Sequence, residues 1–195
     1  MRVKVEKAFK VREDLRQLTH FGVAIAAVLV VSFIGFNSSL LLIFVLFLFG
    51  LLLANAKALG GKVKIIDQFL ALVDREVAIP GQGAMFFAAG ILLLLTFQRP
   101  LELALAIIML HGAGDAFATI VGIRFNSKLP WNQKKTWQGL AAFIVCGVAA
   151  ASFFIPFTQA ITYAVILAIV ESLDLPLDDN VAVPVSALIL RGFGI

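Results

Sequence analysis

The chain contains little charge and a single cysteine. Only 14% of its 195 residues are Asp, Glu, Lys or Arg, whereas 61% are hydrophobic. A soluble domain carries about 25% charged residues, so this composition excludes an ordinary soluble fold and indicates an integral membrane protein. The one cysteine, Cys146, lies in an apolar run and cannot form an internal disulfide, so we expect it to serve packing. Repeats and low-complexity tracts are also missing, so we expect one domain, residues 1–195.

The nucleotide-binding loops of soluble enzymes are missing as well. The chain has no GxxxxGK[ST] sequence and no GxGxxG sequence after a strand. The short sequence Gly81-Gln82-Gly83 follows Pro80 and is explained more simply as a turn before a helix than as a phosphate loop. Any nucleotide chemistry must therefore be carried by membrane segments and their connections.

Long apolar runs dominate the chain instead. Seven segments are apolar enough to be membrane helices, although the third, sixth and seventh are short for a full crossing. They are Leu18–Phe36, Ser38–Ala56, Gly83–Phe97, Leu101–Gly122, Gly139–Pro156, Ala160–Ser172 and Asn180–Gly192. The last contains Pro184, which disfavours an uninterrupted helix. The expected fold is all-α: a polytopic integral membrane protein with about seven transmembrane helices.

Basic residues are distributed asymmetrically between the connections. Fourteen of the 16 lysines and arginines lie in the amino-terminal tail and in the second and fourth connections. Connections rich in lysine and arginine stay in the cytoplasm, so we expect the amino-terminal tail and the second and fourth connections to face the cytosol. We expect the membrane to be the cell membrane of a prokaryote. Residues 1–17 and 62–77 each have an apolar and a charged face, so we expect cytosolic amphipathic helices lying on the membrane surface.

The most informative polar residue is Asp115, which lies inside the fourth apolar segment. A carboxylate near the centre of a membrane helix costs about 2.5–3.5 kcal/mol, so we expect it to bind or react with something. It precedes Gly122 by seven residues, which places it about 10 Å from that end of the helix. His111 and Thr119 lie four residues before and after it, so all three share one helix face.

Further acidic and basic residues are expected at the same membrane face. They are Glu171, Asp178, Asp179 and Asn180 at the end of the sixth segment, and Arg124, Lys128, Lys134 and Lys135 after the fourth. Carboxylate and amide oxygens suit Mg²⁺, and the bases neutralise phosphate charge. Phosphoryl transfer needs little more than these groups and an in-line hydroxyl. The combination favours an enzyme.

Each group also has a simpler explanation. A transporter could use Asp115 and Glu171 as a proton relay. The basic connection could be only a topology signal, and Asp178-Asp179-Asn180 could cap a helix. His20 could be an interfacial anchor, and His111 a core histidine. The enzyme hypothesis depends on these groups meeting at one face of the membrane, and a small proton-coupled transporter stays the alternative.

Two blocks of sequence contain most of these residues. The first runs Gly114-Asp115-Ala116-Phe117-Ala118-Thr119-Ile120-Val121-Gly122-Ile123-Arg124-Phe125, then Lys128-Leu129-Pro130-Trp131-Asn132 and Lys135-Thr136-Trp137-Gln138-Gly139. The second contains Glu171-Ser172-Leu173 and Asp178-Asp179-Asn180. Together they resemble the CTP-dependent lipid-alcohol kinases, which include phytol, dolichol and yeast-type diacylglycerol kinases. That family shares a superfamily with the phosphatidate cytidylyltransferases.

The resemblance implies a kinase that transfers a phosphoryl group from CTP to a membrane lipid alcohol, with Mg²⁺ as cofactor. The sequence looks most like phytol kinases, so an isoprenoid alcohol of the phytol or polyprenol type is expected first and diacylglycerol second. The His-Gly-Gly sequence before an Asp that is usual in cytidylyltransferases is missing, which favours kinase activity over CDP-lipid synthesis. The expected partners are CTP, the lipid alcohol and the bilayer, with no nucleic acid. A homodimer is left open.

The resemblance also divides the candidate residues into roles. The catalytic candidates are Asp115, Lys135 and Glu171. The candidates for binding nucleotide or phosphate are Gly114, Arg124, Lys128, Asn132, Lys134 and Thr136. The metal candidates are Asp115, Asp178, Asp179 and Asn180. The candidates for the acceptor side or the membrane interface are Arg16, His20 and His111.

Overall fold

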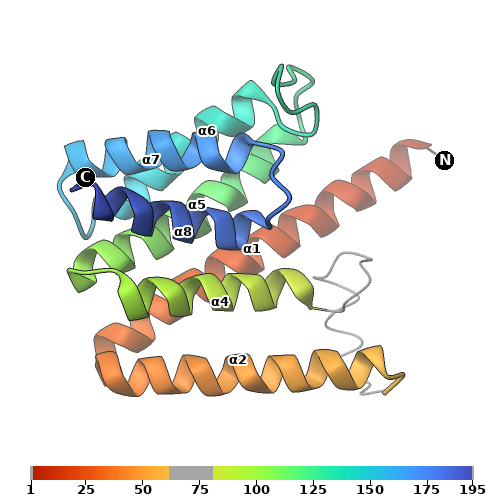
Figure 1. Cartoon of the computed structure of the whole chain (residues 1–195). Coiled ribbons are helices and arrows are strands. Elements are labelled where there is room, and N and C mark those ends of the chain that lie inside the picture. The colour runs from red at the N-terminus through yellow and green to blue at the C-terminus, as the bar shows by residue number, and fades with distance from the viewer. Residues whose placement is uncertain (1, 62–80, 195) are drawn as a thin grey trace.

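The computed structural model describes residues 2–61 and 81–194, with side chains from Lys10 onward (Figure 1). Its helices are α1 (Arg2–Ile34), α2 (Phe36–Ala58), α4 (Gln82–Phe97), α5 (Leu101–Gly122), α6 (Trp137–Ala151), α7 (Phe157–Ser172) and α8 (Asp179–Gly192). The described residues contain no strand, only an isolated bridge between Lys128 and Thr136. The expected all-α fold is confirmed for this part of the chain.

Three of the described helical segments are long and apolar enough to cross a membrane. They are Lys10–Ile34, Phe36–Ala58 and Leu101–Gly122, and three shorter apolar helices cover Gln82–Phe97, Trp137–Ala151 and Phe157–Ser172. A helix of 16 residues is about 24 Å long, which is less than the hydrocarbon thickness of about 30 Å. The protein is therefore an apolar helical bundle suited to a membrane, whereas seven full crossings stay a prediction.

The amino-terminal helix differs from the expectation. One continuous helix covers Arg2–Ile34, whereas the sequence predicted a surface helix followed by a separate membrane segment. The sequence has no glycine or proline before Gly22, so nothing breaks the helix between its charged and apolar parts. It ends at Gly35, whose positive φ of 81° suits glycine. The second predicted surface helix, residues 62–77, lies outside the described residues.

Helix α5 lies at the centre of the bundle and packs most closely on α6 and α1. Glycines permit this close approach: a Cβ atom at Gly147 would lie 3.2 Å from Leu110, and one at Gly114 would lie 3.0 Å from the ring of Phe143. Small residues at helix contacts are typical of membrane bundles. The packing buries His111 and leaves Asp115 half-buried on the same helix.

Helix α8 continues through Pro184 because another helix covers the interruption. Proline has no N–H group to bond the carbonyl of Asn180 four residues earlier. Gly90 of helix α4 packs directly against this part of α8. A Cβ atom at Gly90 would collide with the carbonyl oxygen of Asn180 and with the ring of Pro184. The first turn of α8, which carries Asp179, is thereby held close against α4.

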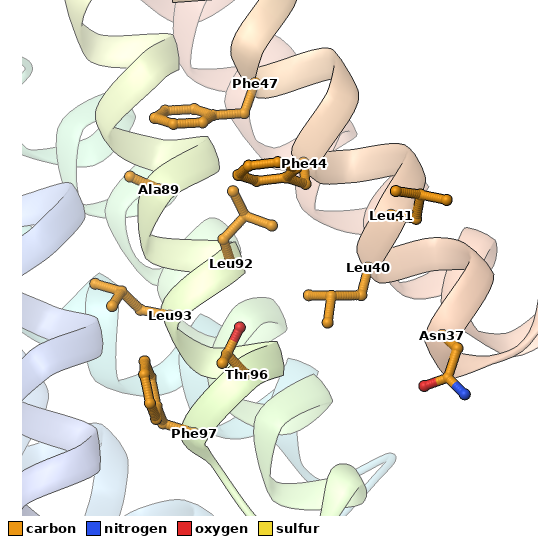
Figure 2. A pocket seen from close by; sticks show the side chains of 10 residues that line it. All are labelled: Asn37, Leu40, Leu41, Phe44, Phe47, Ala89, Leu92, Leu93, Thr96 and Phe97. Carbon is orange, nitrogen blue, oxygen red and sulfur yellow. The ribbon is translucent and has the colours of Figure 1, made fainter.

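Helix α2 lies at the edge of the bundle beside α4 (Figure 1), and only its Ser39 and Ala54 are buried. A groove of about 620 Å³ separates the two helices (Figure 2). Its lining consists of Asn37, Leu40, Leu41, Phe44, Phe47, Ala89, Leu92, Leu93, Thr96 and Phe97. Because none of these side chains is ionisable, the groove suits hydrocarbon and offers nothing for acid–base or phosphoryl chemistry.

Candidate active site

Three carboxylates from three different helices meet at one end of the bundle. Asp115 comes from α5, Glu171 from the last turn of α7 and Asp179 from the first turn of α8. One oxygen of each lies within 4.8 Å of the others, and Glu171 is only 3% exposed. Carboxylates this close repel each other unless cations lie between or beside them. Nearby positive charge therefore stabilises this arrangement.

Lys135 supplies part of that charge. Its Nζ atom forms an ion pair with Glu171 Oε1 and lies 3.4 Å from Asp179 Oδ2. Burial alone would lower the pKa of Lys135, but the charges of Glu171, Asp179 and Asp115 raise it above its ordinary value. The lysine is therefore a fixed cation that contacts two of the three carboxylates, Glu171 and Asp179.

The connection between α5 and α6 positions this lysine through local hydrogen bonds. The buried Leu129 donates its backbone N–H to the carbonyl of Lys135 at 3.1 Å. Asn132, which is 5% exposed, accepts the backbone N–H of Lys134 at 2.9 Å. Thr136 then caps α6 by accepting the N–H of Gly139 at 3.1 Å. Asn132 and Thr136 were predicted to bind nucleotide. In the structure, Asn132 Oδ1 and Thr136 Oγ1 accept backbone hydrogen bonds that stabilise the connection between α5 and α6.

Helix α1 forms a further wall of the site through a residue that the sequence did not single out. Gln17 is 1% exposed. With its amide oriented to satisfy its neighbours, Nε2 donates to Asp115 Oδ2 at 3.2 Å. Its Oε1 accepts from Arg16 Nη2 at 2.7 Å and from Thr119 Oγ1 at 2.9 Å. A glutamine at the start of an apolar run looks like an interfacial polar residue, so no sequence signal distinguished it.

A polar cavity of about 310 Å³ opens beside Lys135 and Glu171. It is lined by Glu13, Ala118, Thr119, Gly122, Ile123, Leu129, Lys134, Lys135, Thr136, Gly139, Leu140, Glu171 and Ser172. Its lining comes from α1, α5, the connection after α5, α6 and α7. The candidate catalytic pair, Lys135 and Glu171, thus lies at the wall of a space that polar ligands can enter.

The predicted metal set is divided by the structure. Asp115 and Asp179 meet, and Glu171 joins them. Asp178 instead caps α8, accepting the backbone N–H of Asn180 at 3.0 Å, and burial together with Asp179 raises the pKa of Asp178. Asn180 Oδ1 lies 3.3 Å from His111 Nε2. Asp178 and Asn180 therefore support the start of α8 through these contacts.

The other predicted residues are exposed or have partners outside the three-carboxylate cluster. Arg124 pairs with Asp14 on α1 at 2.6 Å, and Lys134 pairs with Asp174 at 3.0 Å, both at the surface. Lys128 is exposed. The ring of His20 packs edge-on against Phe87 at 5.4 Å, and the ring of His111 lies 5.7 Å from the same phenylalanine.

The donor set fits a hard divalent cation. Mg²⁺ prefers carboxylate oxygens and is usually held by one or two carboxylates together with phosphate oxygens. Asp115 and Asp179, neither of them fully buried, would hold such an ion, and Glu171 lies beside them with its charge balanced by Lys135. No sulfur or imidazole belongs to the three-carboxylate cluster, so the chemistry does not suit a softer metal.

Comparisons with known proteins found curated relatives. The chain is 29% identical over 128 residues to a probable chloroplastic phytol kinase of Triticum aestivum, covering 56% of this chain and 43% of that protein. It is 33% identical over 126 residues to an uncharacterized protein of Methanocaldococcus jannaschii, covering 63% of each. A probable chloroplastic phytol kinase of Glycine max is 25% identical over 128 residues, covering 56% of this chain and 44% of that protein.

These matches span less than two thirds of each relative's length. No family model matches the chain, and no solved structure matches it. The two plant relatives described above both carry the name probable phytol kinase. The resemblance to the lipid-alcohol kinases that the sequence predicted is thereby confirmed, as a distant similarity of this chain to the phytol kinases.

Proposed function

We propose that the protein is a CTP-dependent kinase that phosphorylates the hydroxyl of a membrane lipid alcohol. An isoprenoid alcohol of the phytol or polyprenol type is the preferred acceptor, and diacylglycerol is the second candidate. The observation that carries the proposal is the meeting of Asp115, Glu171 and Asp179 around Lys135, next to a polar cavity. Similarity to proteins named phytol kinases supports the same reaction class.

The two sides of the site suit two different substrates. The polar cavity beside Lys135 suits the triphosphate of the donor, because a buried lysine neutralises phosphate charge. Asp115 lies inside an apolar helix, so it is the carboxylate nearest to where a lipid hydroxyl would arrive. A Mg²⁺ ion bound by Asp115 and Asp179 would neutralise the phosphate oxygens and align the donor.

The reaction balances with the groups at hand. The hydroxyl oxygen of the lipid forms a bond to the γ-phosphorus of CTP, and the bond from that phosphorus to the β-phosphate oxygen breaks. The hydroxyl proton passes to Asp115 and from there to water, while Lys135 stabilises the charge that develops on the phosphates. The products are a lipid monophosphate and CDP.

A product assay with purified protein tests this function. The protein in detergent is incubated with CTP labelled in the γ-phosphate or in the cytosine, Mg²⁺ and a panel of phytol, a polyprenol and diacylglycerol. Transfer of γ-label to lipid supports the kinase, and transfer of cytosine label to a lipid, with phosphatidate added, reveals a cytidylyltransferase instead. If neither product forms, the kinase is rejected and proton-coupled transport becomes the hypothesis to pursue.

Sidedness is tested separately with cysteine labels in a protein whose Cys146 has been replaced. Gln133 and Leu177 lie in exposed connections near the site, whereas Asn37 and Thr158 are exposed in the first turns of α2 and α7, and the first turn of α7 is at the opposite end of that helix from Glu171. We expect positions 133 and 177 to react from the cytosolic side only, and positions 37 and 158 from the outside only. External labelling at 133 or 177 contradicts a cytosolic site, because the CTP pool is cytosolic.

A further inference from the structure

Gln17 is an almost completely buried polar side chain at the boundary between the charged and apolar parts of α1. Burying an amide is costly unless its hydrogen bonds are satisfied. Gln17 makes three, to Asp115, Arg16 and Thr119, with donor–acceptor distances of 2.7–3.2 Å. Its partners therefore include one carboxylate of the three-carboxylate cluster and one cation.

The identity of this side chain is chemically restricted. To contact these partners, it must donate a hydrogen bond to a carboxylate and at the same time accept from a guanidinium and a hydroxyl. An amide does both, whereas glutamate cannot donate when ionised and lysine cannot accept. Asparagine has the same groups on a stem one methylene shorter. Gln17 is thus matched to its place by length as well as by chemistry.

Arg16 is held from two directions. Its Nη2 atom lies 2.6 Å from Glu13 Oε1 and 2.7 Å from Gln17 Oε1, and its Nε lies 3.2 Å from Glu13 Oε2. The guanidinium also interacts electrostatically with Asp115 and Asp179. Glu13 itself lines the polar cavity. The amide of Gln17 thus links the cation Arg16 to Asp115, one of the three carboxylates of the site.

We propose that Gln17 is a positioning residue for metal binding, which fixes the carboxylate of Asp115 and the guanidinium of Arg16 relative to each other. This inference rests on the proposed function for its consequence in catalysis, although its effect on cation binding does not. With Oδ2 of Asp115 held by the amide, the carboxylate keeps one orientation, in which one of its oxygens lies within 4.8 Å of an oxygen of Glu171 and of Asp179. Side chains that orient carboxylate ligands commonly change metal affinity 10–100-fold when they are removed.

The test compares Gln17→Met with Gln98→Met in the full-length protein. Methionine keeps the length of glutamine and removes its hydrogen bonds. Gln98 is equally buried, but it lies at the far end of α4 and its amide has no partner among the described residues. Binding of Mn²⁺ alone is measured by electron paramagnetic resonance, and turnover is measured across a Mg²⁺ titration.

We expect Gln17→Met to weaken Mn²⁺ binding at least 10-fold and to raise the Mg²⁺ concentration needed for half-maximal turnover by a similar factor. Saturating Mg²⁺ should restore a large part of kcat, and Gln98→Met should behave like wild type. If Gln17→Met does not yield monodisperse protein, Gln17→Asn serves instead, because it keeps a polar amide yet cannot reach all three partners. Wild-type Mn²⁺ affinity in the folded variant overturns the proposal.

The same experiment separates this inference from the proposed function. Weakened Mn²⁺ binding in the Gln17 variant, with no lipid phosphate formed by wild type, would reject the kinase and retain the positioning role. Active wild type, with unchanged Mn²⁺ binding in the variant, would retain the kinase and reject the positioning role.

Discussion

Asn132 donates a hydrogen bond from Nδ2 to the backbone carbonyl of Ser172 at 3.1 Å. This bond joins the connection after α5 to the last turn of α7. Lys135 and Glu171, which form an ion pair, lie three residues after Asn132 and one residue before Ser172. The amide therefore holds the lysine and the glutamate as one unit, which explains why a buried asparagine lies in this connection.

Asp115→Asn should reduce turnover at least 100-fold while leaving a folded, membrane-inserted protein. The substitution preserves shape and removes the charge that the site uses, and removing a charge from a membrane helix eases insertion. Lipid phosphate formation measures the loss, and size-exclusion chromatography in detergent reports folding. Near-normal turnover would remove Asp115 from the mechanism.

Lys135→Ala should lower activity far more than Lys134→Ala. Lys135 is partly buried between Glu171 and Asp179, and a preorganised cation in such a site contributes several kcal/mol to transition-state stabilisation. The pair between Lys134 and Asp174 is exposed on both sides and is worth about 1 kcal/mol or less. Steady-state kinetics should show a loss of at least 100-fold for the first variant and about threefold or less for the second. Equal effects would contradict this division.

Asp179→Asn and Asp178→Asn should have different effects on turnover, although the sequence places both residues among the metal candidates. Asp179 belongs to the carboxylate cluster, so its variant should lose activity, and added Mg²⁺ should partly restore it by mass action. Asp178 caps α8, and asparagine caps about as well as aspartate. The Asp178 variant should therefore stay close to wild type at every Mg²⁺ concentration in a turnover assay. A loss that Mg²⁺ relieves in Asp178→Asn would return Asp178 to the metal set.

The raised pKa of Lys135 predicts how its contribution to stability depends on pH. A raised pKa means that the folded protein holds the proton on Lys135 Nζ more tightly than the unfolded chain does. In the unfolded chain the pKa of lysine is about 10.4. The stabilisation is fully present below that pH and is lost only as pH rises through the higher folded pKa. The Tm difference between wild type and Lys135→Met should therefore not become smaller as pH rises from about 7 to 9. A decrease within that range would show that the carboxylates do not hold the proton.

Gly139→Ala should destabilise the protein, because a Cβ atom there would lie 2.8 Å from the backbone carbonyl oxygen of Ala118. Forcing α5 and α6 apart costs about 1–3 kcal/mol, and it also displaces the capping Thr136. Gly22→Ala is the matched control, since a Cβ atom there meets nothing within 4 Å and alanine favours a helix. Thermal unfolding in detergent should show a lower Tm for the first variant and an equal or higher Tm for the second.

The helices could be located from sequence because apolar runs bounded by glycine, proline and charge are a local signal. The segment Leu101–Gly122 matches α5 at both ends, and α4, α7 and α8 differ from their predicted segments by at most three residues at either end. The predicted fifth segment is longer than α6, because residues 152–155 form a turn ahead of Pro156. The change from charged to apolar residues predicts a boundary between two helices, whereas α1 continues through it because no glycine or proline lies there.

The contents of the site were partly predictable, but its pairings were not. Asp115 was noticeable because a carboxylate is rare in an apolar helix. The grouping of Glu171 with Asp115 and Asp179 depends on how α5, α7 and α8 pack, and no spacing in the sequence encodes that. Asp178 and Asp179 are equivalent in sequence, and only the start of α8 distinguishes the cap from the member of the cluster. Gln17 acquires its role solely from the crossing of α1 over α5.

The site draws on the first described helix and on the last, through Gln17 and Asp179. During synthesis the ribosome delivers α1 first and α8 last, so the carboxylate cluster is incomplete until α8 has joined the bundle. Nascent chains in which α8 has not yet joined α1, α5 and α7 therefore lack the three-carboxylate cluster. Under the proposal that this cluster binds a cation, cation affinity would report whether α8 has packed against these helices.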